Sequence, residues 1–439
     1  MKDSPALFCC RPIMVCLLAW ASCATLQAAE NPAQSFHQAL QNALENNPNM
    51  ASAAASLRSA EEKYSQAMAS LLPSIDLEAG KSKTSVDYQK FPSQNTNIGR
   101  LGVSMNQVLF NWQAIEAYRQ ADPFVKAYVQ DFEAMRQTIA ISVVQGAIEW
   151  LQARDVVDLA DNNLRLTEHQ LEATQARFTV GELTMTDVSQ ALARVSLARA
   201  NKISADNSLA AADARYVELV GFPPVDNLVL PTLNPASLTI SAKEAQNQMM
   251  QRPDLEAARL RLAVAESNIE LEKAGHLPTV NLSSTYFKKT DVEVSGFKTD
   301  LNEFTMGVTM NLPLFKGGLT TSRTQQARAD RDNQMATYDR LLQQIQRETT
   351  QAILDIKSAD ASVKALEDGV KASKAAMEGV EQEFQVGTRT SLDLLDAQNE
   401  YFTAQTNLAK SRYSWELARF RLLKAVGRLT LNELGMVGE

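Results

Sequence analysis

A short polar segment around residue 390 holds the side chains best suited to acid chemistry. Asp393 and Asp396 stand three residues apart, so on a helix their carboxylates would lie on nearly the same face. Thr390 and Asp393 have the spacing of a capping box at a helix start, which gives Asp393 a structural explanation. Asp396 has no such explanation. Carboxylates gathered around an opening attract cations and repel anions, so these two acids are candidates for an ion filter.

The chain carries one pattern twice, at a distance of 205 or 206 residues. The matching segments are 72–77 and 277–282, 102–106 and 307–311, 178–181 and 384–387, and 220–221 and 426–427. Thr184 and Asp187 have the same capping-box spacing as Thr390 and Asp393, but Gln190 stands where the second copy has Asp396. The period is far too long for a solenoid repeat, so the pattern indicates that one large structural unit has been duplicated and fused.

The composition argues against an enzyme and against a nucleic-acid partner. The formal net charge is −8, which does not favour binding to phosphates. All four cysteines fall within residues 1–29, and the three histidines, His37, His169 and His276, have no ligand spacing between them. The sequence also lacks a glycine-rich phosphate loop. It therefore predicts no catalytic residue, no metal site and no cofactor.

Residues 1–29 are expected to form a secretory signal peptide. Lys2 and Arg11 precede a mostly apolar run, 13–26, and small residues follow it as a cleavage site. A lipid-attachment site at Cys23 is the less favoured alternative, because Trp20 stands where such a site usually has leucine. The rest of the chain lacks the run of about 18 apolar residues that a transmembrane helix needs. If this exported chain crosses a membrane, it must therefore do so with strands.

Each copy is expected to contain a helical stretch, two strands and a long helical hairpin. Repeat 1 spans 30–221 and repeat 2 spans 242–427, with a proline-rich connector at 222–241 and a C-terminal tail at 428–439. The opening helical stretches are expected at 36–71 and 242–277. Alternating apolar and polar residues predict strands at about 74–90, 97–110, 279–290 and 303–312, joined by polar loops. A soluble sheet and a membrane β-barrel both fit this alternation.

The two hairpins are expected to be long and closely packed. The segments 113–178 and 319–384 would each form a helix of about 100 Å at the usual helical rise. Gly181 and Gly387 would end these helices, with hairpin tips at about 179–187 and 385–396. The returning helices, 184–220 and 390–426, carry a seven-residue repeat with small residues beside it, which is typical of coiled-coil packing.

Four strands cannot close a barrel, and an open sheet edge in lipid is very costly. Several chains would therefore have to share one barrel. Two chains would give eight strands filled by side chains, and three would give twelve strands around an aqueous lumen. The alternative is a secreted coiled-coil scaffold or adhesin, which explains the heptads but not the strands at matching places in both copies.

Two segments resemble the hairpin tips of the TolC family of outer-membrane channels. The segment 386–397, VGTRTSLDLLDA, is similar to the second tip, and 178–188, FTVGELTMTDV, is similar to the first. The resemblance covers the whole mature chain and implies a homotrimer with a twelve-stranded β-barrel in outer-membrane lipid and an α-helical periplasmic tunnel. It also implies export of drugs or proteins with a periplasmic adaptor and an inner-membrane transporter of the ABC or RND type.

The resemblance also implies roles for residues at the tips. Asp393 and Asp396 from three chains would form an acidic ring at the periplasmic entrance. Arg389 would link to Thr186 and Asp187 on a neighbouring hairpin and hold the entrance closed. The family's tyrosine partner is replaced by Phe384 here, so closure would rest more heavily on Arg389. The expected adaptor contacts are Gly181, Glu182, Leu183, Gly387 and Thr388.

Overall fold

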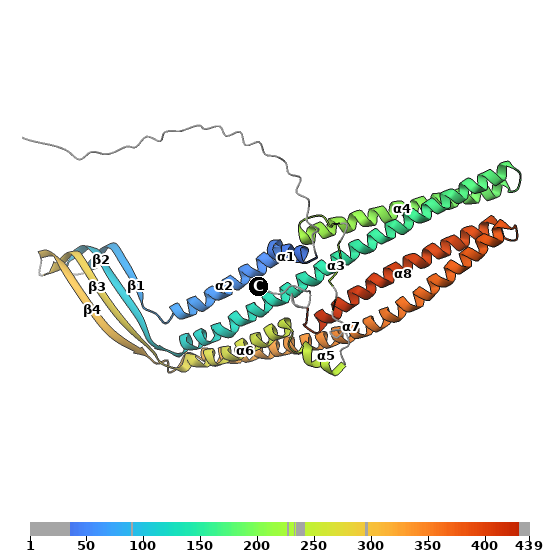
Figure 1. Cartoon of the computed structure of the whole chain (residues 1–439). Coiled ribbons are helices and arrows are strands. Elements are labelled where there is room, and N and C mark those ends of the chain that lie inside the picture. The colour runs from blue at the N-terminus through green and yellow to red at the C-terminus, as the bar shows by residue number, and fades with distance from the viewer. Residues whose placement is uncertain are drawn as a thin grey trace, which may run out of the picture.

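A four-stranded antiparallel sheet and the tips of two long helical hairpins lie at opposite ends of an elongated molecule (Figure 1). The computed structural model describes residues 36–88, 91–225, 228–231, 233, 242–294 and 297–429. The expected signal peptide, most of the connector and all but the first two residues of the expected tail lie outside the described residues.

The sheet is built from both copies in the order β1-β2-β3-β4. Its strands are β1 (Ser74–Tyr88), β2 (Phe91–Asn111), β3 (Thr279–Val294) and β4 (Phe297–Asn311). The expected loops were too long, because β2 begins at 91 rather than 97 and β4 begins at 297 rather than 303. Polar residues there obscured the alternation, yet their backbones are paired, as in Ser85 opposite Asn95. Backbone ladders do not require apolar side chains.

The register of the strands separates apolar and polar side chains onto two faces. Residues directly opposite one another in antiparallel strands share a face. One row across the sheet is Leu77, Val103, Tyr286 and Phe304. The next row, on the other face, is Glu78, Gly102, Phe287 and Glu303. Leu77 is 74% exposed and Phe304 is 66% exposed, so the apolar face is not covered by the described residues.

The helical stretch before each pair of strands is broken into two helices. The first gives α1 (Phe36–Asn46) and α2 (Pro48–Ala69), and the second gives α5 (Ala242–Met249) and α6 (Pro253–Lys273). A single continuous helix in each copy was therefore the wrong expectation. Proline disfavours helical geometry in the residue before it but suits the first turn of a new helix. Asn47 caps α2 by accepting a bond from the Asn49 amide at 2.9 Å.

Two helical hairpins run away from the sheet in the same direction (Figure 1). Hairpin 1 consists of α3 (Trp112–Thr179) and α4 (Met185–Val220), and hairpin 2 consists of α7 (Leu319–Gln385) and α8 (Ser391–Ala425). These bounds agree closely with the expected helices. The expected seam of α4 is buried at Ala191, Val195, Ala198 and Ala205. Among the described residues, no helix is both long and apolar enough to cross a membrane.

A buried apolar cluster joins the two hairpins near the middle of the molecule. Phe36 and Leu40 of α1 pack there with Val143 of α3, Tyr216 of α4 and Phe420 of α8. Burial raises the pKa of Tyr216 to about 12, so this phenol stays neutral. The two copies are therefore held together at a central level, while the hairpin tips extend beyond it.

A buried arginine connects three helices at the same central level. Arg252, with 9% of its side chain exposed, donates to Asp254 at 2.6 Å, to Glu348 at 3.3 Å and to the Ala425 carbonyl at 3.3 Å. Burial opposes the positive charge, but the two carboxylates outweigh it, and the pKa of Arg252 lies above its usual value. Burial and the nearby Arg252 lower the pKa of Lys424.

The substitution Arg252→Met should therefore destabilise the protein. It leaves two carboxylates and a carbonyl without their donor, and breaking a buried charge network costs on the order of 3 kcal/mol. Arg259→Met is the matched control, because Arg259 is 63% exposed and pairs with Glu256 on its own helix. Thermal unfolding of detergent-solubilised protein should show a midpoint several degrees lower for Arg252→Met alone. Equal unfolding midpoints for the two variants would contradict a stabilising role of the Arg252 network.

Candidate functional site

The two hairpins end in turns with nearly the same backbone. Turn 1 covers residues 180–184 and turn 2 covers 386–390. Gly181 and Gly387 both have φ of +81°, a left-handed conformation that side chains other than glycine's disfavour. The amide of Glu182 bonds to the Arg177 carbonyl at 3.0 Å, and the amide of Thr388 bonds to the Glu383 carbonyl at 2.9 Å. Glycine thus ends both long helices with the same geometry.

Both returning helices begin with the expected capping box. The Asp187 amide donates to Thr184 Oγ1 at 3.3 Å, and the Asp393 amide donates to Thr390 Oγ1 at 3.2 Å. Each carboxylate in turn accepts from the threonine backbone amide, at 2.9 Å and 3.0 Å respectively. Hydrogen bonds from these threonines hold the pKa of Asp187 and of Asp393 below the usual aspartate value. Both acids are therefore ionised at neutral pH.

Arg389 is engaged within its own hairpin. Its Nε donates to Glu383 Oε2 at 2.8 Å, and both side chains are about half exposed, at 50% and 51%. That bond raises the pKa of Arg389. Within one chain the structure therefore does not place Arg389 on Thr186 or Asp187. The expected link to those residues of a neighbouring chain stays a prediction.

Asp396 has a partner that the sequence did not suggest. Arg194 of α4 forms an ion pair with Asp396 of α8, and so connects hairpin 1 to hairpin 2. The side chain of Arg194 is 30% exposed and that of Asp396 is 57% exposed. Asp396 takes no part in a capping box, as expected, but its carboxylate forms a contact between the two hairpins that the sequence did not predict.

Phe384 makes a second contact between the hairpins. The Arg177 guanidinium lies over the Phe384 ring, 4.7 Å from its centre, and the ring is 8% exposed. An aromatic ring attracts a cation through its negative face and needs no hydroxyl to do so. The contacts Arg177–Phe384 and Arg194–Asp396 together are called the tip latch below.

The residues missed from the sequence occupy positions where the two copies differ. Arg177 in copy 1 corresponds to Glu383 in copy 2, and Arg194 corresponds to Glu400, each 206 residues later. Arg389 and Asp396 likewise correspond to Leu183 and Gln190. A systematic search for charged differences between the copies could have found Arg177 and Arg194. Among the described residues, no group of His, Cys, Asp or Glu side chains is arranged to hold a metal ion.

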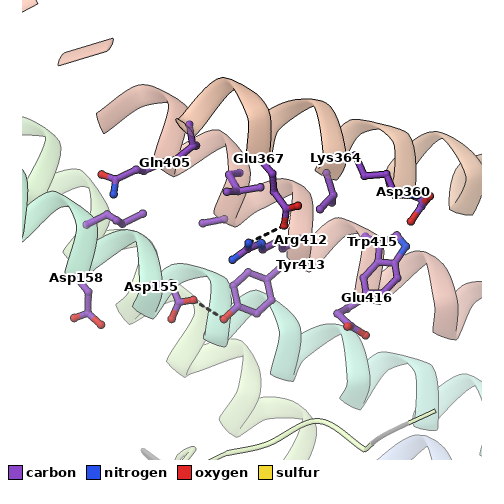
Figure 2. Close-up of a pocket in the computed structure, with 15 residues that line it drawn as sticks. Asp155, Asp158, Asp360, Lys364, Glu367, Gln405, Arg412, Tyr413, Trp415 and Glu416 are labelled. Atoms are coloured by element: carbon purple, nitrogen blue, oxygen red, sulfur yellow. Dashed lines mark hydrogen bonds and ion pairs between the residues drawn. The ribbon is translucent and has the colours of Figure 1, made fainter. Parts of the chain in front are cut away.

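Between the central cluster and the tip latch, the hairpins enclose a groove of about 860 Å³ (Figure 2). Residues of α3, α7 and α8 line it. The Tyr413 hydroxyl of α8 donates to Asp155 of α3 at 2.6 Å, while Arg412 donates to Glu367 within hairpin 2 at 2.8 Å. Burial and the bond to Asp155 raise the pKa of Tyr413. The Tyr413–Asp155 bond thus ties the two hairpins at the edge of the groove.

The sheet and the hairpins together define a class of protein. A sheet with one apolar face and two free edge strands is joined to two long hairpins that end in charged turns. This is the architecture of an outer-membrane channel protein with a helical periplasmic extension.

The chain belongs to the outer membrane efflux protein family, which it matches over residues 39–221 and 245–428. These two segments correspond to the two copies. The chain is 30% identical over 412 residues to outer membrane protein TolC of Vibrio cholerae, covering 92% of each protein. It is 25% identical to the alkaline protease secretion protein AprF of Pseudomonas aeruginosa, covering 90% of this chain and 85% of that protein.

Solved structures share the fold. A crystal structure of CusC superposes with a TM-score of 0.81 at 19% identity, covering 89% of this chain and 92% of that chain. The open state of the MtrE outer membrane channel of Neisseria gonorrhoeae superposes with a TM-score of 0.76 at 20% identity, covering 90% and 89%. The family transports molecules and is not a family of enzymes.

Proposed function

We propose that three copies of this chain form an outer-membrane channel that exports drugs or proteins through a twelve-stranded β-barrel and an α-helical periplasmic tunnel. The observation that carries this proposal is the register of the sheet. It places Leu77, Val103, Tyr286 and Phe304 on one face across all four strands. An apolar outer face with a polar inner face is the pattern of a barrel in lipid.

The edges of the sheet support association of several copies. β1 and β4 are the edge strands, and among the described residues each has a row of backbone groups without a partner strand. In lipid these groups must be paired, so β4 of one copy would pair with β1 of the next. Three copies give twelve strands, which leaves room for an aqueous lumen. The same three-fold axis would bring six hairpins around one tunnel.

At the tips, the three-fold axis would gather Asp393 and Asp396 from each chain around the periplasmic entrance as a ring selective for cations. Arg389 would reach Thr186 and Asp187 of the neighbouring chain and restrain opening. Its side chain is 50% exposed, which supports this role, because the guanidinium is accessible to a neighbouring chain. The entrance would open when the hairpin tips move apart.

The proposed partners are a periplasmic adaptor and an inner-membrane transporter of the ABC or RND type. The adaptor would contact the two turns through Gly181, Glu182, Leu183, Gly387 and Thr388, which are exposed or partly exposed. Related proteins carry names from both kinds of export. One is an antibiotic efflux pump outer membrane protein, ArpC of Pseudomonas putida, and another is the proteases secretion protein PrtF of Dickeya chrysanthemi. We therefore propose both drugs and proteins as classes of exported molecule.

The central test is ion selectivity of the purified protein in planar bilayers. The double variant Asp393→Ala with Asp396→Ala should lose cation selectivity, because the acidic ring would be gone. Reversal potentials in a KCl gradient measure this. Asp368→Ala is the control, since it removes an exposed carboxylate of α7 that lies away from the tip and leaves the ring intact. Retained selectivity in the double variant would place the filter elsewhere.

Arg389→Ala should raise single-channel conductance, because one restraint between neighbouring chains is removed. Glu383→Gln is the companion variant, since it releases Arg389 from its own hairpin without removing the guanidinium. If the restraint acts between chains, only Arg389→Ala opens the entrance. Unchanged conductance in Arg389→Ala would remove this residue from the restraint.

Photo-crosslinking amino acids at Glu182 and Thr388 should capture the adaptor in cells of the source organism. The same group placed at Lys371, an exposed residue about four turns from turn 2 on α7, is the control. Mass spectrometry of the captured protein would identify the adaptor, and the transporter that copurifies with it would distinguish the ABC type from the RND type. Equal capture of one adaptor at all three positions would contradict docking at the turns.

A further inference from the structure

The two hairpins of one chain are joined very differently along their length. Near the middle of the molecule, Val143, Tyr216 and Phe420 belong to a buried apolar cluster that includes both hairpins. Toward the tips, grooves of about 860 Å³ and 520 Å³ lie between residues of the two hairpins. Beyond the grooves, the hairpins meet again at the tip latch. The grooves thus separate two places where the hairpins are in contact, the central cluster and the tip latch.

The tip latch involves one of the two acids of the proposed ring. Asp396 is paired with Arg194 of the other hairpin, whereas Asp393 is held by Thr390 at the start of its own helix. Separation of the hairpins would break the Arg194–Asp396 pair. It would leave the Asp393 capping box unchanged, because that box lies within hairpin 2. The two acids therefore respond differently to opening.

We propose that Arg194 determines the ion selectivity of the channel by neutralising Asp396 while the tip is closed and releasing it when the hairpins separate. This inference rests on the proposed function. The closed entrance would present the three Asp393 carboxylates with three neutralised Asp396 pairs. The open entrance would present six carboxylates. Cation selectivity would thus increase as the entrance opens.

The Arg177–Phe384 contact of the tip latch supports this inference. Phe384 lacks the hydroxyl with which a tyrosine would form a hydrogen bond. The Arg177 guanidinium instead stacks on the face of its ring. Both contacts of the tip latch thus pair an arginine of hairpin 1 with a residue of hairpin 2. Outward movement of hairpin 2 would break both at the same step, so release of Asp396 would accompany opening rather than precede it.

The inference is tested with Arg194→Gln, Arg194→Lys and Arg199→Gln in planar bilayers. In the low-conductance state, Arg194→Gln should raise the K⁺ to Cl⁻ permeability ratio by about twofold, since the number of uncompensated carboxylates doubles. Arg194→Lys should retain the wild-type ratio. Arg199→Gln is the matched control, because Arg199 is 63% exposed and pairs with Glu168 inside hairpin 1. Trimers resistant to detergent on gels would show that each variant is assembled.

A double variant separates action through Asp396 from a general effect of charge. In an Asp396→Asn background, Arg194→Gln should change the permeability ratio no further. A wild-type ratio in Arg194→Gln, or the same change in both backgrounds, would overturn the inference while leaving the channel assignment intact. Wild-type protein that forms no cation-selective channel would instead overturn the proposed function.

Discussion

The structure depends above all on the need to pair backbone hydrogen-bonding groups where water is absent. In the part of the chain that the structure describes, β1 and β4 each have one edge without a partner strand, and unpaired groups in hydrocarbon cost several kcal/mol each. In the proposed channel, copies of the chain would complete the sheet. The proposed three-fold axis then follows, and with it the tunnel and the gathering of the tips at one entrance.

The sequence predicts the long elements well and their interruptions poorly. The heptads of α4 and α8 and the glycines at both turns locate the hairpins within a residue or two. The breaks at Pro48 and Pro253 were missed because alanine-rich composition outweighed single prolines. The capping boxes were predicted because they are local. The pairs Arg194–Asp396 and Arg177–Phe384 were not, since their partners lie on different hairpins about 200 residues apart.

The contacts between the hairpins contribute more energy at the central level than at the tips. The central cluster buries large side chains such as Phe420 and Tyr216, each contributing roughly 2 kcal/mol or more. The ion pair Arg194–Asp396 is partly exposed and contributes about 0–1 kcal/mol, and the Arg177–Phe384 contact contributes about 1 kcal/mol. The tips can therefore separate at a cost of a few kcal/mol while the central level stays intact.

The position of the Tyr413–Asp155 bond limits how much of each hairpin can move. Tyr413 lies 17 positions after Asp396 on α8, or roughly 25 Å at the helical rise. Duplication supplied two hairpins with the same turns and the same capping boxes, so identical copies would have had identical tips. The charged residues of the tip latch, Arg177, Arg194 and Asp396, all stand where the copies differ. Divergence of the copies thus gave the two tips unlike side chains. In the tip latch, copy 1 supplies two arginines, and copy 2 supplies the acid and the aromatic ring that contact them.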